Sequence, residues 1–270
     1  MPELPEVETS CRGIEPHCIK QNITKIDVRQ PKLRWLVDAE LSPKLSGEEI
    51  SQVKRRGKYI LLQTSQGDLM IHLGMSGSLR VVDKKVEVTK HDHIDICLSN
   101  GKIIRYNDPR RFGCFVLNME GEQHKLLNKL GVEPLTDDFS LDYFYPICKG
   151  RKTAIKSLIM NGQVVVGVGN IYAQEALFRA KINPHRAANS ISQKRIVDLI
   201  EAIKLILQRA IEAGGSSLKD FTSADGKPGY FQQTLQVYGR AGKQCAVCKA
   251  ALEQAVIGQR NTVYCSQCQK

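Results

Sequence analysis

Cys245-Ala-Val-Cys248 and, sixteen residues later, Cys265-Ser-Gln-Cys268 decide how the C-terminal part of this chain folds. Each motif is a Cys-x-x-Cys pair, and the spacing between the pairs is typical of zinc-binding segments. Four thiolates complete the tetrahedron that Zn²⁺ prefers, and a site closed in this way leaves no position for a substrate. The sequence therefore predicts one structural zinc ion as cofactor, with two disulfides as the alternative.

The segment between the two cysteine pairs is expected to return as a β-hairpin. Its polar tip, residues 258–262, carries a single arginine, Arg260. A guanidinium on a metal-stiffened tip is suited to gripping a phosphate group. An arginine that is merely solvated in a loop is the other interpretation, and Arg260 alone favours it.

The charge balance indicates a polyanionic partner. The chain has 270 residues, with 39 Lys and Arg against 28 Asp and Glu, a formal net charge of +11 and a pI of about 9.2. An excess of this size attracts polyanions over long range, and nucleic acid is the leading candidate. The length favours two domains.

The distribution of apolar residues and cysteines bears on location. No apolar run reaches the roughly 18 residues of a membrane span, and no basic and apolar leader is recognisable. We therefore expect a soluble cytoplasmic protein without a membrane partner. The cysteines outside the zinc motifs are odd in number and scattered, which suits a reducing compartment and core positions; they are Cys11, Cys18, Cys97, Cys114 and Cys148.

The first residues, Met1-Pro2-Glu3, carry a candidate nucleophile. Removal of Met1 would leave Pro2 with a secondary α-amine, whose ordinary pKa is about 8. Such an amine can attack a carbonyl or anomeric carbon and form a Schiff base, with Glu3 beside it as general acid. The alternative is a proline in the first turn of a helix, and these residues alone favour it. A short helix is expected over residues 5–16.

The region from that helix to about residue 118 is predicted to be mainly β-structure. Strands are expected at 59–63, 69–73, 94–98 and 103–106, and the Asn100-Gly101 pair is a strong hairpin signal. Turn signals about every ten residues suggest an antiparallel sandwich. The loops at 54–58, 72–77, 91–93 and 108–113 carry candidate functional residues, because cations followed by an aromatic suit phosphate contact and base stacking.

Helices are predicted to dominate the rest of the chain. Residues 133–149 read as an interdomain connection with few apolar periods, and helices follow at 152–160 and after Asn170, interpreted as a capping side chain. Ser190 and Gln193 form a capping-box pattern before an amphipathic helix over 196–211, which Gly214 ends. The polar stretch 215–229 is interpreted as a disordered loop or a lid.

These motifs, in this order, closely resemble bacterial formamidopyrimidine-DNA glycosylase. The resemblance rests on the start 2–6, Lys58, the stretch 168–172 and the four-cysteine hairpin with Arg260, and it covers essentially the whole chain. It implies an α+β fold with an N-terminal catalytic β-sandwich domain at 1–132, a linker with a helix-two-turns-helix module at 133–235, and a zinc finger at 236–270. It also implies that double-stranded DNA with oxidised purines or abasic sites is the partner.

The resemblance further implies roles for individual residues. Pro2 would attack the sugar and become the Schiff base, releasing 8-oxoguanine or a formamidopyrimidine, with Glu3 as acid and base. Lys58 would assist elimination at the abasic site, and Arg260 would grip the phosphate beside the lesion and assist a second elimination. Further DNA contacts would come from other side chains, which are His72, His91, Arg151 and Asn170.

Two more features of the family have counterparts here. Met75, Arg110 and Phe112 match the wedge that fills the stack vacated by the lesion and contacts the orphaned base. Residues 217–230 match the lesion-capping loop. One departure concerns the finger arginine: the family often flanks it with glycines, whereas Gln259 and Asn261 flank Arg260, which leaves the detailed shape of the loop open.

Two rival functions remain on the sequence alone. An endonuclease VIII-like enzyme for oxidised pyrimidines typically has glycine where Leu4 stands and lacks the wedge, so the sequence favours the purine enzyme. A zinc-ribbon DNA-binding protein without catalysis would explain the charge and the finger, but it leaves Pro2, Glu3 and Lys58 without a role. No obligate protein partner is expected, and binding of one duplex in a cleft suggests a monomer.

Overall fold

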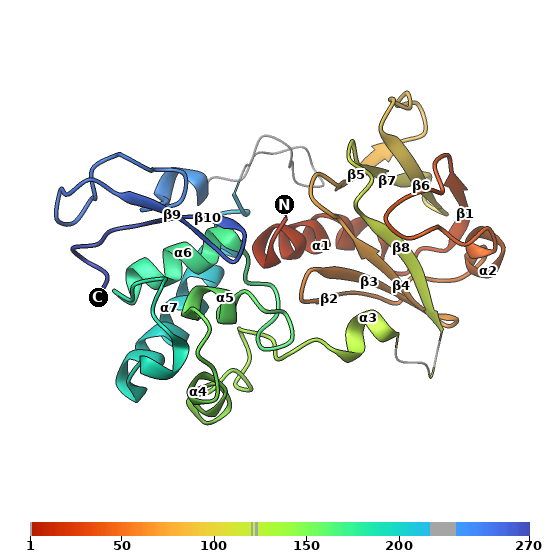
Figure 1. Ribbon diagram of the computed structural model, residues 1–270. Helices are drawn as coiled ribbons and strands as arrows, with labels where there is room; N and C mark the ends of the chain where they lie inside the picture. Colours follow the sequence, from red (N-terminus) through yellow and green to blue (C-terminus); the bar gives the residue numbers. More distant parts are fainter. Residues whose placement is uncertain (1, 120, 122–123, 217–230) are drawn as a thin grey trace. The chain divides into compact units, whose positions relative to one another are not determined.

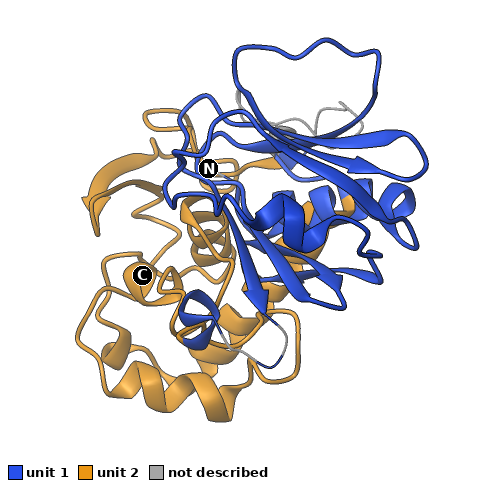
Figure 2. Cartoon of the chain, turned by 90° about the vertical axis from the view of Figure 1, so that its right-hand side faces the viewer, with its two compact units in different colours: residues 1–128, 213–232 blue, residues 129–212, 233–270 orange. Residues whose placement is uncertain are grey.

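The computed structural model describes residues 2–119, 121, 124–216 and 231–270 (Figure 1). Met1 and the predicted lesion-capping loop at 217–230 therefore lie outside the described residues. The chain divides into two compact units, residues 1–128 with 213–232 and residues 129–212 with 233–270 (Figure 2).

The first unit is built around two four-stranded antiparallel sheets, as the sequence predicted. One sheet has the order β1-β6-β7-β5 and the other β2-β3-β4-β8. Its elements are α1 (Leu4–Cys18), β1 (Ile23–Val28), α2 (Leu41–Leu45), β2 (Gln52–Arg56), β3 (Tyr59–Thr64), β4 (Gly67–His72), β5 (Ser78–Asp83), β6 (Asp92–Leu98), β7 (Lys102–Asn107), β8 (Cys114–Met119) and α3 (Lys125–Asn128).

Turn chemistry explains where the central hairpins reverse. Between β6 and β7 the chain turns at Gly101, whose φ of +81° is readily available only to glycine. The N–H of Gly101 donates to the carbonyl of Leu98 at 3.0 Å, which closes the turn. β3 and β4 pair in register from Tyr59 opposite His72 to Thr64 opposite Gly67. Both hairpins predicted from the sequence are confirmed.

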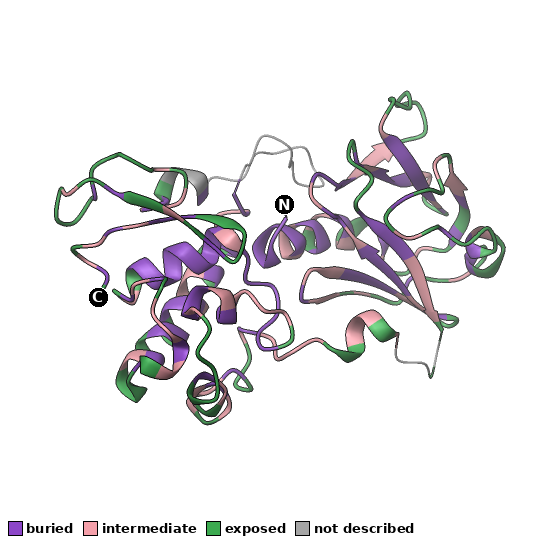
Figure 3. Cartoon of the chain, in the orientation of Figure 1, coloured by how far each residue is buried: buried purple, intermediate pink, exposed green. Residues whose placement is uncertain are grey.

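The core of the first unit follows the period of two that strands impose. Ile60 and Leu62 of β3, and Ile94 and Ile96 of β6, belong to one buried apolar cluster (Figure 3). Helix α1 contributes its apolar side to the same cluster and packs against β2 and β3. Helix α1 therefore packs on the two strands joined by the turn that carries Lys58.

The second unit is helical and ends in a two-stranded hairpin. Helices α6 and α7 pack on each other, and α4 packs on α7. The bounds are α4 (Leu141–Lys149), α5 (Ile155–Ile159), α6 (Asn170–Arg179), η1 (Ala188–Ser190), α7 (Gln193–Glu212), β9 (Glu253–Ile257) and β10 (Arg260–Tyr264), and η2 (Phe231–Thr234) lies where the two units meet in the sequence. The stripe of α7 is largely buried, as its period of 3.6 predicts.

Three local predictions for this unit were wrong. The presumed connection contains a helix, α4, which Ser140 caps by accepting from the N–H of Tyr143 and which buries Phe144 and Cys148; the helix is so short that its apolar period was missed. Ser190 does not cap α7, because its hydroxyl donates to the carbonyl of Ala187 and the helix begins three residues later. Asn170 is the first residue of α6, and its N-cap is Gly169.

No helix within the described residues combines the length and the apolar character needed to span a membrane.

Candidate DNA interface and zinc centre

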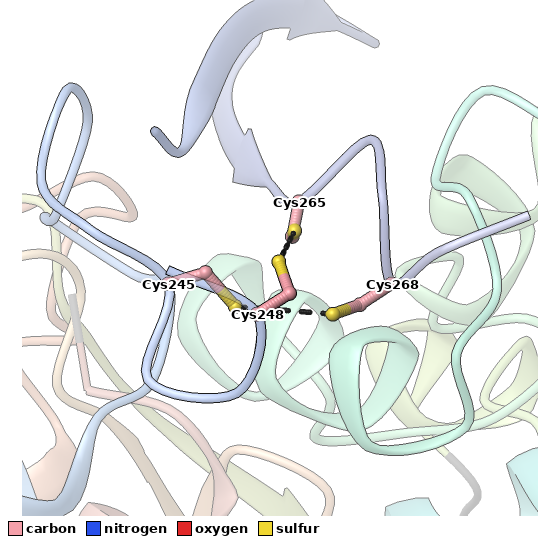
Figure 4. Close-up of side chains that lie close together, drawn as sticks. All are labelled: Cys245, Cys248, Cys265 and Cys268. Carbon is pink, nitrogen blue, oxygen red and sulfur yellow. Dashed lines mark hydrogen bonds between the residues drawn. The ribbon is translucent and has the colours of Figure 1, made fainter. Parts of the chain in front are cut away.

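The four cysteines of the zinc motifs converge at one point. All four sulfur atoms lie within 4.8 Å of one another (Figure 4). The Sγ atoms of Cys245 and Cys268 are 3.9 Å apart and those of Cys248 and Cys265 are 3.4 Å apart. Disulfide sulfurs would be about 2.05 Å apart, whereas sulfurs bound to one tetrahedral zinc at 2.3 Å stand about 3.8 Å apart. The arrangement fits a single structural zinc ion and excludes the disulfide alternative.

The zinc hairpin is docked on α6 by polar side chains of that helix. The carboxylate of Glu175 accepts from the backbone N–H groups of residues 236, 237 and 238, at 2.9–3.0 Å. Gln174 accepts from the N–H of Val263 and donates to the carbonyl of Asn261. A small apolar cluster under the metal site, including Phe178 and Leu252, completes the contact. The hairpin is thereby held in a fixed orientation on the second unit.

Arg260 is the exposed first residue of β10, directly after a tight turn. Gly258 and Gln259 both have positive φ, +56° and +60°, as a two-residue type I′ hairpin turn requires. Gln259 thus adopts a conformation that glycine adopts more easily. The turn before Arg260 therefore forms although Gln259 stands where the family often has glycine. A side chain at Gly258 would meet the Oγ of Ser157 at 2.9 Å. The turn therefore lies close to α5.

Lys156 on α5 joins the hairpin to the start of α6. Its ammonium group is fully buried and donates to the Oδ1 of Asn170 and to the Oγ1 of Thr262, both at 2.6 Å. The Nδ2 of Asn170 donates to the carbonyl of Asn261 at 3.0 Å. The structure thus brings two predicted DNA-contact positions, Asn170 and Arg260, into one hydrogen-bonded assembly. Sequence reasoning missed Lys156, because no pattern distinguishes it from a surface lysine.

In the first unit, the candidate nucleophile precedes a reciprocally capped helix. Pro2 and Glu3 are buried, and Glu3 and Glu6 form a capping box in which the Oε2 of Glu6 accepts from the N–H of Glu3 at 2.8 Å. The Oε1 of Glu6 accepts from the N–H and the hydroxyl of Ser216, at 2.8 and 2.9 Å. Glu6 therefore ties the N-terminal segment to Ser216, the last described residue before position 217. The Glu-x-x-Glu spacing was the overlooked signal.

Lys58 and His72 lie near each other at the ends of the second sheet. Lys58 follows Gly57 in the turn between β2 and β3, and His72 pairs with Tyr59 in the register of β3 and β4. Burial, reinforced by the charge of Lys58, lowers the pKa of His72 to about 4. Its Nδ1 accepts from the N–H of Gly74 at 2.9 Å, so the neutral ring carries its proton on Nε2. His72 is therefore suited to donate a hydrogen bond and not to act as a cation.

The predicted wedge residues lie on two loops that share one buried carboxylate. The Oδ1 of Asp108 accepts from the hydroxyl of Ser76 at 2.7 Å and from the N–H of Arg110 at 3.2 Å. Its Oδ2 accepts from the hydroxyl of Tyr106 at 2.9 Å and from the N–H of Gly113 at 3.0 Å. Asp108 is completely buried. It organises both wedge loops, and sequence reasoning missed it.

The two wedge loops also touch backbone to backbone. A Cβ on Gly74 would lie 2.5 Å from the carbonyl carbon of Phe112, and Gly74 has a φ of +65°. Phe112 is 42% exposed despite its apolar ring, and the guanidinium of Arg110 lies 4.9 Å above that ring. An aromatic ring held out in this way is available for insertion between bases.

His91 and Arg151 complete the set of predicted DNA contacts. The carbonyl of His91 accepts from the N–H of Asp108 at 3.0 Å, so His91 borders the wedge loops. Arg151 is exposed after α4 in the second unit. The first unit therefore holds Pro2, Glu3, Lys58, His72, Met75, His91, Arg110 and Phe112, and the second holds Arg151, Asn170, Arg260 and the zinc cysteines.

Comparison with known proteins gives matches over nearly the whole chain. The model of the formamidopyrimidine-DNA glycosylase N-terminal domain matches residues 1–115, that of the H2TH domain of the same enzyme matches 130–222, and that of a zinc finger found in FPG and IleRS matches 242–270. A formamidopyrimidine-DNA glycosylase of Aliivibrio fischeri is 53% identical over 269 residues, covering 100% of this chain and 98% of the relative.

Solved structures of Lactococcus lactis Fpg show the same architecture. A variant in complex with DNA containing Fapy-dG is 33% identical, has a TM-score of 0.92 and covers 100% of both chains. A complex with DNA containing an abasic site is 33% identical, has a TM-score of 0.91 and covers 99% of both chains.

Proposed function

Because the chain belongs to the formamidopyrimidine-DNA glycosylase family, we propose that it removes oxidised purines from DNA through a Schiff base at Pro2 and then cleaves the abasic strand. The chain is a glycosylase and AP lyase of base-excision repair. Its substrates are 8-oxoguanine and formamidopyrimidine lesions in double-stranded DNA, and we place its action in the bacterial cytoplasm.

The first chemical step is displacement of the damaged base by the Pro2 amine. With Met1 removed, the amine attacks C1′, the bond from C1′ to the base breaks, and the base leaves with a proton. The proline nitrogen then gives up its proton, O4′ takes up a proton as the sugar ring opens, and a 4′-hydroxyl and a positively charged iminium on the secondary amine result. Glu3, buried directly beside Pro2, supplies and removes protons at the sugar.

The second chemical phase is elimination from the iminium. Loss of a C2′ proton expels the 3′ phosphate, and a second elimination expels the 5′ phosphate; hydrolysis then releases Pro2. Lys58 stabilises the first departing phosphate, and Arg260 grips the phosphate beside the lesion and assists the second elimination. Both are cations at the exit of a turn, the position in which a side chain reaches out from a rigid sheet.

DNA is held by groups in each unit. Asn170, positioned by Lys156, and Arg260 contact the lesion-strand phosphates, with His72, His91 and Arg151 as further contacts. Met75, Arg110 and Phe112 fill the space left by the extruded nucleotide, which offsets part of the unstacking cost of a few kcal/mol.

The observation that best supports the proposal is the buried capping box that fixes Pro2 and Glu3 at the start of α1. The test compares the processed chain with the same chain retaining Met1, two proteins with identical side chains from residue 2 onward. Both should bind duplexes carrying 8-oxoguanine, whereas only the processed chain should release the base and cut the strand. Equal cleavage by the two proteins would refute Pro2 as the nucleophile.

A further inference from the structure

A basic groove of about 520 Å³ lies beside the wedge in the first unit. Its lining residues are Lys32, Leu33, Arg34, Arg110, Arg111 and Phe112. Four of the six are cations, all of them exposed, and none is acidic. Within the described part of the chain, none of these four cations takes part in an ion pair. The groove is therefore a strongly positive surface with one aromatic ring at its edge.

The loop that supplies Lys32 and Arg34 is fixed to the wedge loop. The N–H of Arg34 donates to the carbonyl of Gly113 at 3.2 Å, and the N–H groups of Leu33 and Val37 both donate to the carbonyl of Pro31 at 3.0 Å. Leu33 and Val37 are buried in the core of the first unit. The cations of this loop thus stand on a rigid support and keep a fixed position relative to Phe112.

Arg111 adopts a backbone conformation that favours glycine. Its φ is +56°, and its N–H donates to the carbonyl of Asp108 at 3.2 Å. A residue with a long side chain in the left-handed region is a strained choice, and strain of this kind gathers where a side chain has a function. The backbone conformation at residue 111 therefore favours glycine over arginine, and the exposed guanidinium is what glycine would lack.

We propose that this groove binds the phosphodiester backbone of the undamaged strand, next to the orphaned base, through Lys32, Arg34 and Arg111. The inference rests on the proposed function, in which Arg110 and Phe112 contact the orphaned base. That base belongs to the undamaged strand, so the cations continuous with the wedge face the phosphates on either side of it. Phosphate contacts of this kind set the register of the duplex and carry no base specificity.

The test measures binding to a duplex that carries an uncleavable abasic-site analogue opposite cytosine. Affinity is determined by fluorescence anisotropy across a salt series for the variants Lys32→Ala, Arg34→Ala and Arg111→Gly. Each lost phosphate contact should reduce the magnitude of the negative slope of log K against log salt by about 1. Lys44→Ala, which removes an exposed cation of the same unit, should leave the slope unchanged.

Neutral methylphosphonate linkages then identify the strand. When the phosphates on both sides of the orphaned base are replaced by such linkages, the magnitude of the slope should itself fall, and the three variants should reduce it no further. Placed in the lesion strand, the same linkages should add to the effect of each variant. Arg111→Gly should not lower the thermal midpoint, because glycine relieves the left-handed backbone.

Two results would overturn the proposal. One is an unchanged salt slope in all three variants, and the other is non-additivity with methylphosphonates of the lesion strand. Failure of the proposed function is recognised separately: a processed wild-type chain that binds these duplexes but never excises 8-oxoguanine refutes the enzyme itself. Normal excision together with either of the two overturning results refutes only the groove.

Discussion

Asp108→Asn should weaken both wedge loops at once. The carboxylate accepts four hydrogen bonds, from two hydroxyls and two backbone N–H groups. The hydroxyls of Ser76 and Tyr106 can rotate to accept from the new amide, but the N–H groups of Arg110 and Gly113 cannot. Because the amide keeps one oxygen, either the N–H of Gly113 loses its acceptor or the N–H of Arg110 keeps only its longer contact, 3.3 Å, to the Oγ of Ser76. The expected cost is about 1–3 kcal/mol.

The neighbouring variants should form a graded series. Tyr106→Phe and Ser76→Ala each remove one donor and leave the carboxylate with three, so each should cost about 1 kcal/mol. Asp108→Ala leaves the buried N–H of Gly113 and both hydroxyls without their acceptor and should cost about 4 kcal/mol, from at least two donors at 1–3 kcal/mol each.

Urea unfolding of the zinc-loaded proteins measures the series, and single-turnover excision of 8-oxoguanine measures its functional consequence. Excision should slow in Asp108→Asn under conditions where the protein is fully folded, because Met75, Arg110 and Phe112 lose their fixed position. A variant Asp108→Asn as stable as the wild type, or Tyr106→Phe as damaging as Asp108→Asn, would refute this reasoning.

Three further perturbations have defined outcomes. Removing zinc with a chelator should unfold the 242–270 hairpin, seen as lost protection from hydrogen exchange, while the first unit keeps its protection; an unchanged hairpin would contradict a structural metal. The pKa of His72 is lowered from about 6.5 in the unfolded chain to about 4 in the folded chain. Between these two pH values the unfolded chain binds more protons, so the stabilisation of the fold that is present above pH 6.5 is lost as the pH falls. Between pH 7 and pH 4.5, the free energy of unfolding measured in urea should fall by about 2 kcal/mol more in the wild type than in His72→Gln. An equal fall in the two proteins would contradict this prediction. Gly74→Ala should lower the free energy of unfolding by about 2 kcal/mol or more, because the new Cβ meets the backbone of Phe112. Gly101→Ala, at a similar φ but in open space, should lower it by only about 1 kcal/mol. Thermal unfolding measures both variants, and equal losses would show that the close approach at Gly74 is unimportant.

The elements with strong periodic signals were predictable from the sequence. The alternation in β6 and the stripe of α7 each place apolar groups on one face, and burial of that face follows from the hydrophobic effect. The Asn100-Gly101 pair marks the hairpin turn because glycine readily adopts positive φ. The cysteine spacing was equally decisive, because few arrangements of four thiolates satisfy one metal.

The failures share a different cause. Helix α4 is held by Phe144 and Cys148, buried through tertiary packing that a nine-residue segment does not announce. The capping role expected of Asn170 was wrong because its side chain bonds Lys156 and the carbonyl of Asn261, and no local pattern indicates these partners. Asp108 and Glu6 were overlooked because a buried carboxylate is recognised by the donors that surround it. In each case one donor, Ser76 or Ser216, is distant in the sequence.

The central claim is that Pro2 forms a Schiff base with the sugar of an oxidised purine nucleotide, and borohydride trapping tests it most directly. The processed chain is treated with borohydride on three duplexes, carrying 8-oxoguanine opposite cytosine, an oxidised thymine, or an abasic site. The account predicts covalent adducts that map to Pro2 by peptide mass analysis, with 8-oxoguanine trapped far better than oxidised thymine. An adduct on a lysine, no adduct despite tight binding, or preferential trapping of the oxidised thymine would contradict it.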